Sequence, residues 1–303
     1  MPITDAADVV PGAAKTYAVT GAASGMGAAV ARQLRAAGHR VIDVDIKEAT
    51  VTADLSTSDG RRDAAAAVMD ACGGRLDGAV LAAGVGPAPG AHVPPLILQV
   101  NYFGVTELLE AWRPALAATN DAKVVVFSSN STTTTPLVPR RAIRALLDGD
   151  AELALRRVGR IPAMRAAWAY AASKIALSRW VRRTAVLPEW AGAGIRLNAL
   201  APGAVLTPLL EKQLATPSEA RNIRAFPVPV GGFGDPDRLA EWAVFMTTPA
   251  ADFLCGSVVF VDGGSDAWFR PDAWPRPVSA RGVPRYLRDM TRFAAARRRQ
   301  RSA

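Results

Sequence analysis

The sequence has few residues that could bind a metal or form disulfide bonds. Its 303 residues include only two cysteines, Cys72 and Cys255, and two histidines, His39 and His92. Two thiols cannot make a disulfide framework, and so few nitrogen and sulfur ligands argue against a zinc site. We therefore expect a protein with no bound metal and no structural disulfides.

Long apolar runs are missing as well. A membrane-spanning helix needs about 20 consecutive apolar residues, and no run of 18 occurs in this chain. The first eight residues include Asp5 and Asp8, where a signal peptide would carry basic residues and then an apolar stretch. We expect a soluble, cytoplasmic protein in which residues 1–14 form a flexible lead.

A net positive charge is nearly absent from most of the chain. The formal net charge is +9, but residues 270–303 hold ten arginines against Asp272 and Asp289, so this segment carries +8 and the rest +1. A nearly neutral body gives no reason to expect nucleic acid or an anionic surface as its partner. Only the C-terminal tail raises that question.

A glycine-rich turn near the N-terminus has the form of a phosphate-binding site. A β-prone run at residues 15–20 leads into Gly21-Ala22-Ala23-Ser24-Gly25-Met26-Gly27 and then into an alanine-rich helix to about Ala37. Glycines let the backbone approach a pyrophosphate, and the helix N-terminus supplies amide donors and positive potential. A plain tight turn is the alternative for such a stretch taken alone.

Strands and helices then alternate along the chain. Residues 40–45, 78–84, 122–128 and 194–200 are β-prone, and residues 59–72 are helical in pattern. Alternation at this spacing is typical of an α/β protein with a doubly wound parallel sheet, whose ligand crevice lies at the carboxyl ends of the strands. We find no strong linker within residues 15–270 and expect one domain.

The second strand ends in an acid about twenty residues after the glycine turn. A carboxylate at this place accepts the ribose hydroxyls of adenosine and repels a 2′-phosphate, which favours NAD over NADP. Asp45 is the residue that we assign to this role. Asp43 is the alternative, because alternation along the strand places it on the same face.

Tyr170 and Lys174 stand four residues apart in an alanine-rich stretch, so on a helix they share one face. The pKa of a free phenol is about 10, and a nearby cation favours the phenolate. We expect the pKa of Tyr170 to be lowered towards neutrality, which would suit proton transfer. Alone, the pair is more typical of a half-buried aromatic beside a solvated charge.

In their order and spacing, the motifs resemble those of the short-chain dehydrogenase/reductase family over about residues 15–271. They are Thr20-Gly21-x-x-x-Gly25-x-Gly27, Asp45, Asp54-Leu55, Ala82-Ala83-Gly84, Asn101, Ser129, Tyr170-x-x-x-Lys174, Pro202-Gly203 and Asp262-Gly263-Gly264. Within the family, the long spacer between Ser129 and Tyr170 resembles that of the bacterial 3α-hydroxysteroid dehydrogenases/carbonyl reductases.

The resemblance implies a Rossmann-type fold and a set of roles. Tyr170 would be the general acid/base, and Lys174 would bind the nicotinamide ribose and lower the tyrosine pKa. Ser129, with Ser128 as the fallback, would hydrogen-bond the substrate carbonyl. Asn101 would hold a water that links the lysine to solvent.

The resemblance also implies NAD as the cofactor and Thr207 as a contact of its carboxamide. The expected cofactor-binding residues are Gly21, Ser24, Gly25, Met26, Gly27, Asp45, Asp54, Leu55, Ala83, Gly84, Tyr170, Lys174, Pro202, Gly203, Val205 and Thr207. Ser24 supports NAD, since members that prefer NADP tend to carry a basic residue there. The usual Asn-Asn-Ala-Gly is here Leu81-Ala82-Ala83-Gly84, which removes a side-chain amide near the adenosine.

Two segments surround the expected substrate cleft. Residues 140–162 hold two short helical patches, for which the resemblance suggests a dimerisation element; a lid packed on its own subunit is the alternative. Residues 208–229 stand where the family closes over substrate, and their apolar side chains favour a hydrophobic alcohol or ketone or else pack the lid itself. Those side chains are Leu209, Leu210, Leu214, Ile223 and Phe226. A polar stretch, Asn130 to Thr135, could also line the cleft and weakens the steroid assignment.

The extension at residues 272–303 has no counterpart in the resemblance. Tyr286, Leu287, Met290, Phe293 and Ala294 form an apolar stripe on a helix whose other faces carry arginine. The helix could dock on a neighbouring subunit, stay solvated, or contact an anionic membrane or nucleic acid. We favour the docked and solvated forms.

The sequence therefore predicts a catalytic domain at residues 15–271 that uses NAD to interconvert a hydrophobic secondary alcohol and its ketone. The expected alcohol is hydroxysteroid-like, terpenoid or cyclic. The expected assembly is a homo-oligomer, most simply a dimer. The alternative is a redox-silent NAD-binding sensor or interaction protein that uses the basic tail. An intact proton relay favours the enzyme. An epimerase or dehydratase of the extended relatives would need a differently spaced glycine turn and a longer C-terminal substrate domain.

Overall fold

The computed structural model describes residues 13–159, 161–273 and 278–301. The described chain forms two compact units, which divide between Asp266 and Ala267. The first unit holds the sheet and nearly all helices. The predicted lead at residues 1–14 lies almost wholly outside the described residues.

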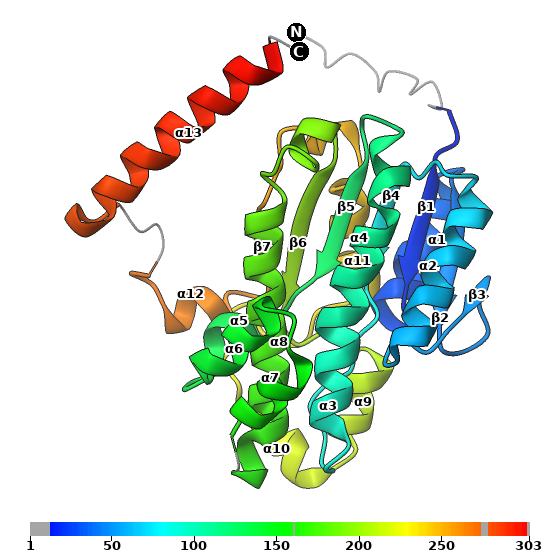
Figure 1. Cartoon of the computed structure of the whole chain (residues 1–303). Coiled ribbons are helices and arrows are strands. Elements are labelled where there is room, and N and C mark those ends of the chain that lie inside the picture. The colour runs from blue at the N-terminus through cyan, green and yellow to red at the C-terminus, as the bar shows by residue number, and fades with distance from the viewer. Residues whose placement is uncertain (1–12, 160, 274–277, 302–303) are drawn as a thin grey trace, which may run out of the picture. The chain divides into compact units, whose positions relative to one another are not determined.

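The first unit is built on one parallel sheet of seven strands in the order β3-β2-β1-β4-β5-β6-β7 (Figure 1). The strands are β1 (Thr16–Thr20), β2 (Arg40–Asp45), β3 (Val51–Thr52), β4 (Gly78–Leu81), β5 (Lys123–Phe127), β6 (Arg196–Pro202) and β7 (Val258–Val261). The order changes direction between β1 and β4, and such a switch point opens a crevice at the carboxyl ends of the strands.

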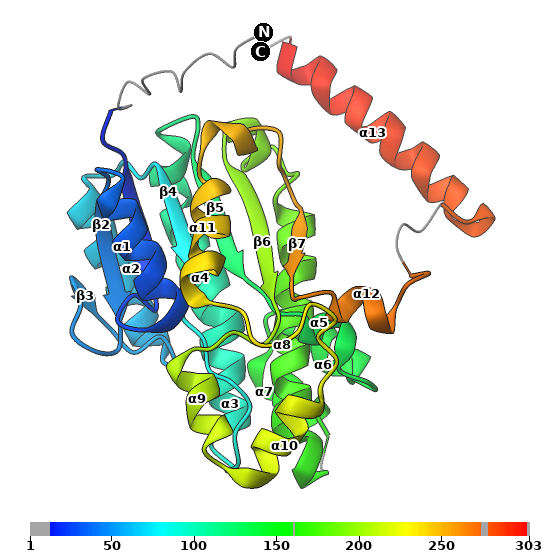
Figure 2. The ribbon, with the colours of Figure 1, turned by 180° about the vertical axis from the view of Figure 1, so that it is seen from behind.

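Helices cover both faces of the sheet, because strand side chains alternate between two apolar cores. Val124 and Val126 face the core formed with α2 (Ser58–Cys72), α4 (Gly104–Ala117) and α8 (Pro162–Thr184). Val125 and Phe127 face the core formed with α1 (Gly25–Ala36) and α11 (Pro236–Phe245), which lie together in Figure 2. The predicted doubly wound α/β fold is confirmed.

The helical segment that carries Asn101 is interrupted. It consists of α3 (Val93–Leu98), a single π-helical turn (Gln99–Phe103) and then α4. A π-turn adds a residue to the helical ladder and often marks a functional site. Asn101, at the centre of the turn, is fully buried.

The segment between Ser129 and Tyr170 forms α5 (Ser131–Thr134), α6 (Arg140–Leu147) and α7 (Ala151–Arg157). Ile143, Leu146 and Ala154 are at most 2% exposed and belong to the same core as α8. The Asp150 side chain caps α7 by accepting a 2.8 Å hydrogen bond from the Leu153 amide. The two helices α6 and α7 thus bury apolar side chains within their own subunit, as in the alternative interpretation, although Leu137 and Ile161 of the segment are exposed. A dimer stays a prediction.

The segment after β6 contains α9 (Pro208–Leu214) and α10 (Pro217–Ala225). Leu210 is buried, whereas the side chain of Leu209 lies outside the described residues. The remaining short elements are the 3₁₀ turns Ala191–Ala193 and Pro249–Ala251 and the helix α12 (Ser265–Phe269).

The second unit contains a 3₁₀ turn (Ala280–Gly282) and α13 (Val283–Arg301). Tyr286, Leu287 and Met290 are each more than half exposed, and Arg285 forms an ion pair with Asp289 at 3.5 Å. The side chain of Ala294 lies outside the description. Within the described residues, no helix is both long and apolar enough to cross a membrane.

Candidate active site

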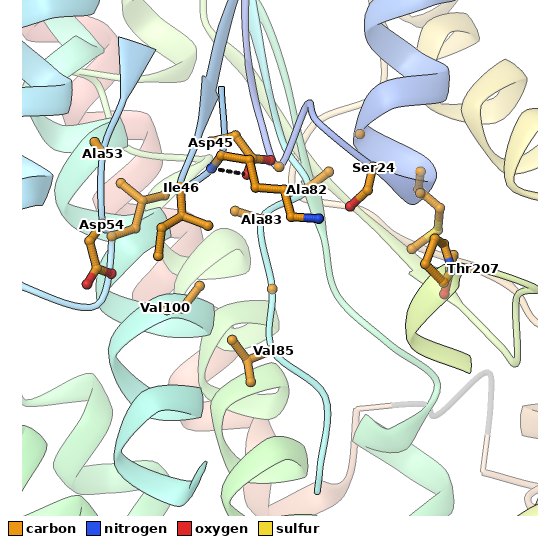
Figure 3. A pocket seen from close by; sticks show the side chains of 18 of the residues that line it. Ser24, Asp45, Ile46, Ala53, Asp54, Ala82, Ala83, Val85, Val100 and Thr207 are labelled. Carbon is orange, nitrogen blue, oxygen red and sulfur yellow. Dashed lines mark hydrogen bonds between the residues drawn. The ribbon is translucent and has the colours of Figure 1, made fainter. Parts of the chain in front are cut away.

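A cavity of about 350 Å³ opens at the carboxyl ends of β1, β2 and β4 (Figure 3). We call it the glycine cavity. Its lining comes from the glycine turn, the ends of β2 and β4, the segment after β3, the π-turn and the start of α9. The lining residues are Gly21, Ser24, Gly25, Met26, Gly27, Asp45, Ile46, Lys47, Ala53, Asp54, Leu55, Ala82, Ala83, Gly84, Val85, Leu96, Val100, Thr207 and Pro208.

The glycine turn leaves no room for side chains. A Cβ on Gly27 would lie 2.2 Å from the Gly21 carbonyl oxygen, and a Cβ on Gly21 would lie 2.7 Å from the Ala83 amide nitrogen. Gly21 and Gly25 also have positive φ angles of 71° and 56°, which glycine adopts without strain. The backbone itself therefore forms this wall of the cavity.

The N-terminus of α1 points its amides at the glycine cavity. The first amides of a helix have no partner within the helix, and the Ser24 side chain at the N-cap makes no capping hydrogen bond. Uncapped amides and the helix dipole favour an anion here. This donor set fits the diphosphate of a dinucleotide.

At the end of β2, Asp45 lines the cavity and Asp43 does not. The Asp45 carboxylate accepts hydrogen bonds from the Ala23 and Lys47 amides, both at 3.0 Å, which fix its orientation. The Asp43 carboxylate instead pairs with Arg35 on α1. Asp45 and Asp43 differ because Asp45 is the last residue of β2 and reaches the crevice, whereas Asp43 lies two residues earlier in the strand.

Most of the expected cofactor residues line the glycine cavity. Pro202, Gly203 and Val205 do not: Pro202 is buried in β6, while Gly203 and Val205 line a separate hollow of about 140 Å³. Tyr170 and Lys174 lie outside the lining as well. The residues that sequence reasoning missed are Ile46, Lys47, Ala53, Ala82, Val85, Leu96, Val100 and Pro208. Six of the eight are direct neighbours of predicted site residues, so adjacency was the available signal for these, but Lys47 and Leu96 adjoin none.

Four polar residues predicted to be catalytic gather behind Gly84, and we call Asn101, Ser129, Tyr170 and Lys174 the catalytic corner. Tyr170 is half-buried on α8 and makes a side-chain hydrogen bond with Ser129, just beyond β5. The Ser129 Oγ accepts a hydrogen bond of 3.1 Å from the Ser131 amide. That bond leaves the hydroxyl proton of Ser129 for another partner.

Lys174 is 4% exposed, and its Nζ donates a 2.7 Å hydrogen bond to the Phe127 carbonyl oxygen. Burial lowers the pKa of Lys174 to about 8. The Nζ lies 5.9 Å from the centroid of the Tyr170 ring. A lysine that loses its proton near pH 8 is suited to exchanging one.

The expected acidification of Tyr170 is wrong for the chain by itself. Burial raises the pKa of Tyr170, and the hydrogen bond with Ser129 opposes this only in part. Sequence spacing predicts that the tyrosine and lysine share a face, but it cannot predict how much solvent the phenol loses on folding, and that loss raises its pKa.

Asn101 holds the loop after β4. Its Oδ1 accepts from the Val85 amide at 2.8 Å, and its Nδ2 donates to the Val85 carbonyl oxygen at 2.9 Å. A Cβ on Gly84 would lie 3.3 Å from the Asn101 Oδ1 and 3.9 Å from the Lys174 Nζ. The catalytic corner and the glycine cavity therefore meet at Gly84.

Ser128, the fallback for Ser129, faces elsewhere. Its Oγ lies 2.7 Å from the Oγ of Ser178 on α8, which donates a 2.9 Å hydrogen bond to the Lys174 carbonyl oxygen. Since the Ser178 proton is used there, Ser128 donates to Ser178. Ser128 thus braces α8, and Ser129 is the serine that meets Tyr170.

The segment after β6 reaches across the cavity. Thr207 caps α9 by accepting a 3.4 Å hydrogen bond from the Leu210 amide, and its methyl group packs near Gly25. The Gln213 Nε2 donates 3.1 Å to the Pro87 carbonyl oxygen in the loop after β4. These contacts hold the lid segment over one side of the glycine cavity.

Comparison with known proteins decides the family. Residues 15–138 match the model described as short chain dehydrogenase, and residues 131–266 match one described as Enoyl-(Acyl carrier protein) reductase. A 3-alpha-hydroxysteroid dehydrogenase/carbonyl reductase of Comamonas testosteroni is 40% identical over 84% of this chain and 97% of its own length. The chain belongs to the short-chain dehydrogenase/reductase family.

Relatives within the short-chain dehydrogenase/reductase family differ in substrate. The galactitol 2-dehydrogenase (L-tagatose-forming) of Cereibacter sphaeroides is 31% identical over 83% of this chain and 94% of its own. Among solved structures, the 3-alpha-hydroxysteroid dehydrogenase from Pseudomonas sp. B-0831, complexed with NADH, is similar at a TM-score of 0.77 and 42% identity. That match covers 85% of this chain and 99% of the other.

Proposed function

We propose that this chain is an NAD(H)-dependent oxidoreductase that interconverts a hydrophobic secondary alcohol and its ketone. The observation that carries the proposal is the catalytic corner, in which a tyrosine, a serine and a buried lysine converge beside the glycine cavity. The similarity to two 3-alpha-hydroxysteroid dehydrogenases supports a hydroxysteroid-like, terpenoid or cyclic substrate.

The glycine cavity fits a dinucleotide in its donors and its shape. The uncapped N-terminus of α1 would hold the diphosphate, and Asp45 would accept the adenosine ribose hydroxyls and repel a 2′-phosphate. Lys174 would bind the nicotinamide ribose. When bound, NAD supplies the carbon that accepts or returns a hydride.

The catalytic corner would hold the substrate oxygen and move its proton. Ser129 would turn its hydroxyl from Tyr170 to donate a hydrogen bond to the substrate carbonyl oxygen, and Tyr170 would give or take the one proton that the reaction moves. Burial raises the pKa of Tyr170 and so favours its protonated form, which suits donation to a ketone. In the reverse direction, Lys174 would favour removal of the proton from Tyr170, and a water held by Asn101 would pass the proton towards solvent.

The proposal is tested by following NAD reduction with steroid, terpenoid and simple cyclic alcohols, with NADP in parallel. We expect turnover of at least one hydrophobic alcohol with NAD, and its loss in Ser129→Ala but not in Ser128→Ala. NADH binding without turnover of any alcohol or ketone would support the alternative, a redox-silent sensor.

We further propose that residues 15–271 act as the catalytic domain. We also propose that the protein is cytoplasmic, because the cytoplasm supplies NAD and keeps free thiols such as Cys72 and Cys255 reduced. A homodimer is the expected assembly, with the basic tail at residues 272–303 solvated or docked. Sedimentation of the full chain and of a form ending at residue 271 measures the oligomeric state and shows whether the tail contributes to it. A monomer in each case would contradict the dimer.

A further inference from the structure

Arg61 on α2 is a buried cation that the proposed chemistry does not use. It is 5% exposed, and a buried arginine remains charged, so it must find partners for its donors. Its contacts with Leu55 and Gln99 lie at the wall between the glycine cavity and the π-turn, and its contact with Glu107 lies on α4. Their arrangement shows what the residue holds together.

The guanidinium reaches three separate segments. Its Nε and Nη2 donate to the two carboxylate oxygens of Glu107 on α4, at 2.6 and 3.1 Å. Its Nη1 donates to the Leu55 carbonyl oxygen at 3.1 Å and to the Gln99 Oε1 at 3.0 Å. Because the pair with Glu107 is bidentate, it fixes the plane of the Arg61 guanidinium and the direction of its remaining N–H groups.

Two of these segments belong to the site. Leu55 lines the glycine cavity, and Gln99 is the first residue of the π-turn that carries Asn101. The guanidinium also lies 6.0 Å from the ring of Phe103, the last residue of the turn. Arg61 therefore contacts both ends of the π-turn and the cavity wall at once.

We propose that Arg61 is a positioning residue, which fixes the π-turn bearing Asn101 against the Leu55 wall of the glycine cavity. Gln99 carries the link to the catalytic corner, and the Leu55 carbonyl carries the link to the cofactor side. We call the link through Gln99 the catalytic arm and the link through Leu55 the binding arm. The effect of the catalytic arm on turnover rests on the proposed function, whereas the effect of the binding arm is measured by NADH affinity alone.

The two arms are separated by single substitutions. Gln99→Leu removes only the hydrogen bond between Arg61 and Gln99. We expect turnover to fall about tenfold and its pH profile to move to higher pH. NADH affinity, measured by NADH fluorescence, should change less than about twofold. Arg61→Met removes both arms, and we expect about a tenfold weaker NADH affinity as well. Arg61→Lys rescues neither, since an ammonium lacks the fork.

The matched control is Arg62→Met. Arg62 is the next residue on α2, its side chain is 70% exposed, and it pairs with Asp59 at the surface. We expect NADH affinity, turnover and its pH profile to match the wild type, because surface pairs contribute little.

A double variant separates positioning from stability. Arg61→Met with Glu107→Leu removes both charges of the pair, so we expect the melting temperature to recover while turnover and its pH profile stay altered. Recovery of turnover, pH profile and NADH affinity together would overturn the proposal and leave Arg61 a structural residue. Absence of turnover in the wild type would contradict the proposed function alone, since the NADH affinity of Arg61→Met still tests the Leu55 arm.

Discussion

The glycine cavity and the catalytic corner meet at Gly84, yet they are built in opposite ways. The cavity depends on side chains that are missing, as at Gly21 and Gly27, where the backbone leaves no room for a Cβ. The corner depends on side chains that are buried, as at Lys174, whose pKa burial lowers to about 8.

The glycine cavity therefore depends mainly on the shape of its backbone, and the catalytic corner depends mainly on the charges of its buried side chains. Changes in the cavity act by steric overlap and should affect cofactor binding first. Changes in the catalytic corner act through protonation and should affect turnover and its pH dependence first. Substitutions in the two regions can therefore test whether the division is real.

The largest effect on cofactor binding is expected from Gly27→Ala in the glycine cavity. The new Cβ would overlap the Gly21 carbonyl oxygen at 2.2 Å, so the turn must open. We expect NADH affinity to fall about 100-fold or more, some 2.8 kcal/mol. Gly73→Asn is the control, since Gly73 has a φ of 62° and open space around it, and asparagine tolerates that conformation. Undisturbed binding in Gly27→Ala would contradict a backbone-built cavity.

An effect on stability rather than on binding, which arises from protonation, is expected from Lys174. Its pKa is about 8 when folded against an ordinary 10.5, so between these values the folded lysine is neutral while the unfolded one is still charged. The wild-type free energy of unfolding should therefore rise with pH across this window, by roughly 3 kcal/mol in total. Lys174→Met should lack this rise. Parallel curves for the two proteins, measured by denaturant unfolding, would show that the lysine is not perturbed.

The smallest effect distinguishes the two aspartates of β2. Asp45→Ala removes the carboxylate that lines the cavity, and we expect the preference for NADH over NADPH in binding to fall at least tenfold, about 1.4 kcal/mol. Asp43→Ala should leave this preference unchanged and cost at most about 1 kcal/mol of stability, because its pair with Arg35 is partly exposed. A change of preference in Asp43→Ala would reassign the selecting acid.

The cavity was the more predictable of the two regions from sequence. Its glycines and the acid at Asp45 lie within one strand, turn, helix and strand, so spacing along the chain suffices to place them. Pro202, Gly203 and Val205 show the limit. They come from a later strand, and only the three-dimensional packing shows that Gly203 and Val205 line another hollow.

The catalytic corner shows what spacing cannot supply. The approach of Tyr170 to Ser129 follows from the family pattern, but the raised pKa of Tyr170 depends on burial created by the whole fold. The π-turn at Asn101 and the buried Arg61 carry no signal in hydrophobic periodicity, since both depend on contacts between distant segments.

Turnover and NADH affinity measured together in Tyr170→Phe test the central claim most directly. The substitution removes one hydroxyl from the catalytic corner and leaves the ring in place beside the glycine cavity. We predict that turnover falls about 10³-fold while NADH affinity stays within about twofold of the wild type. Retained turnover in this variant would contradict the account.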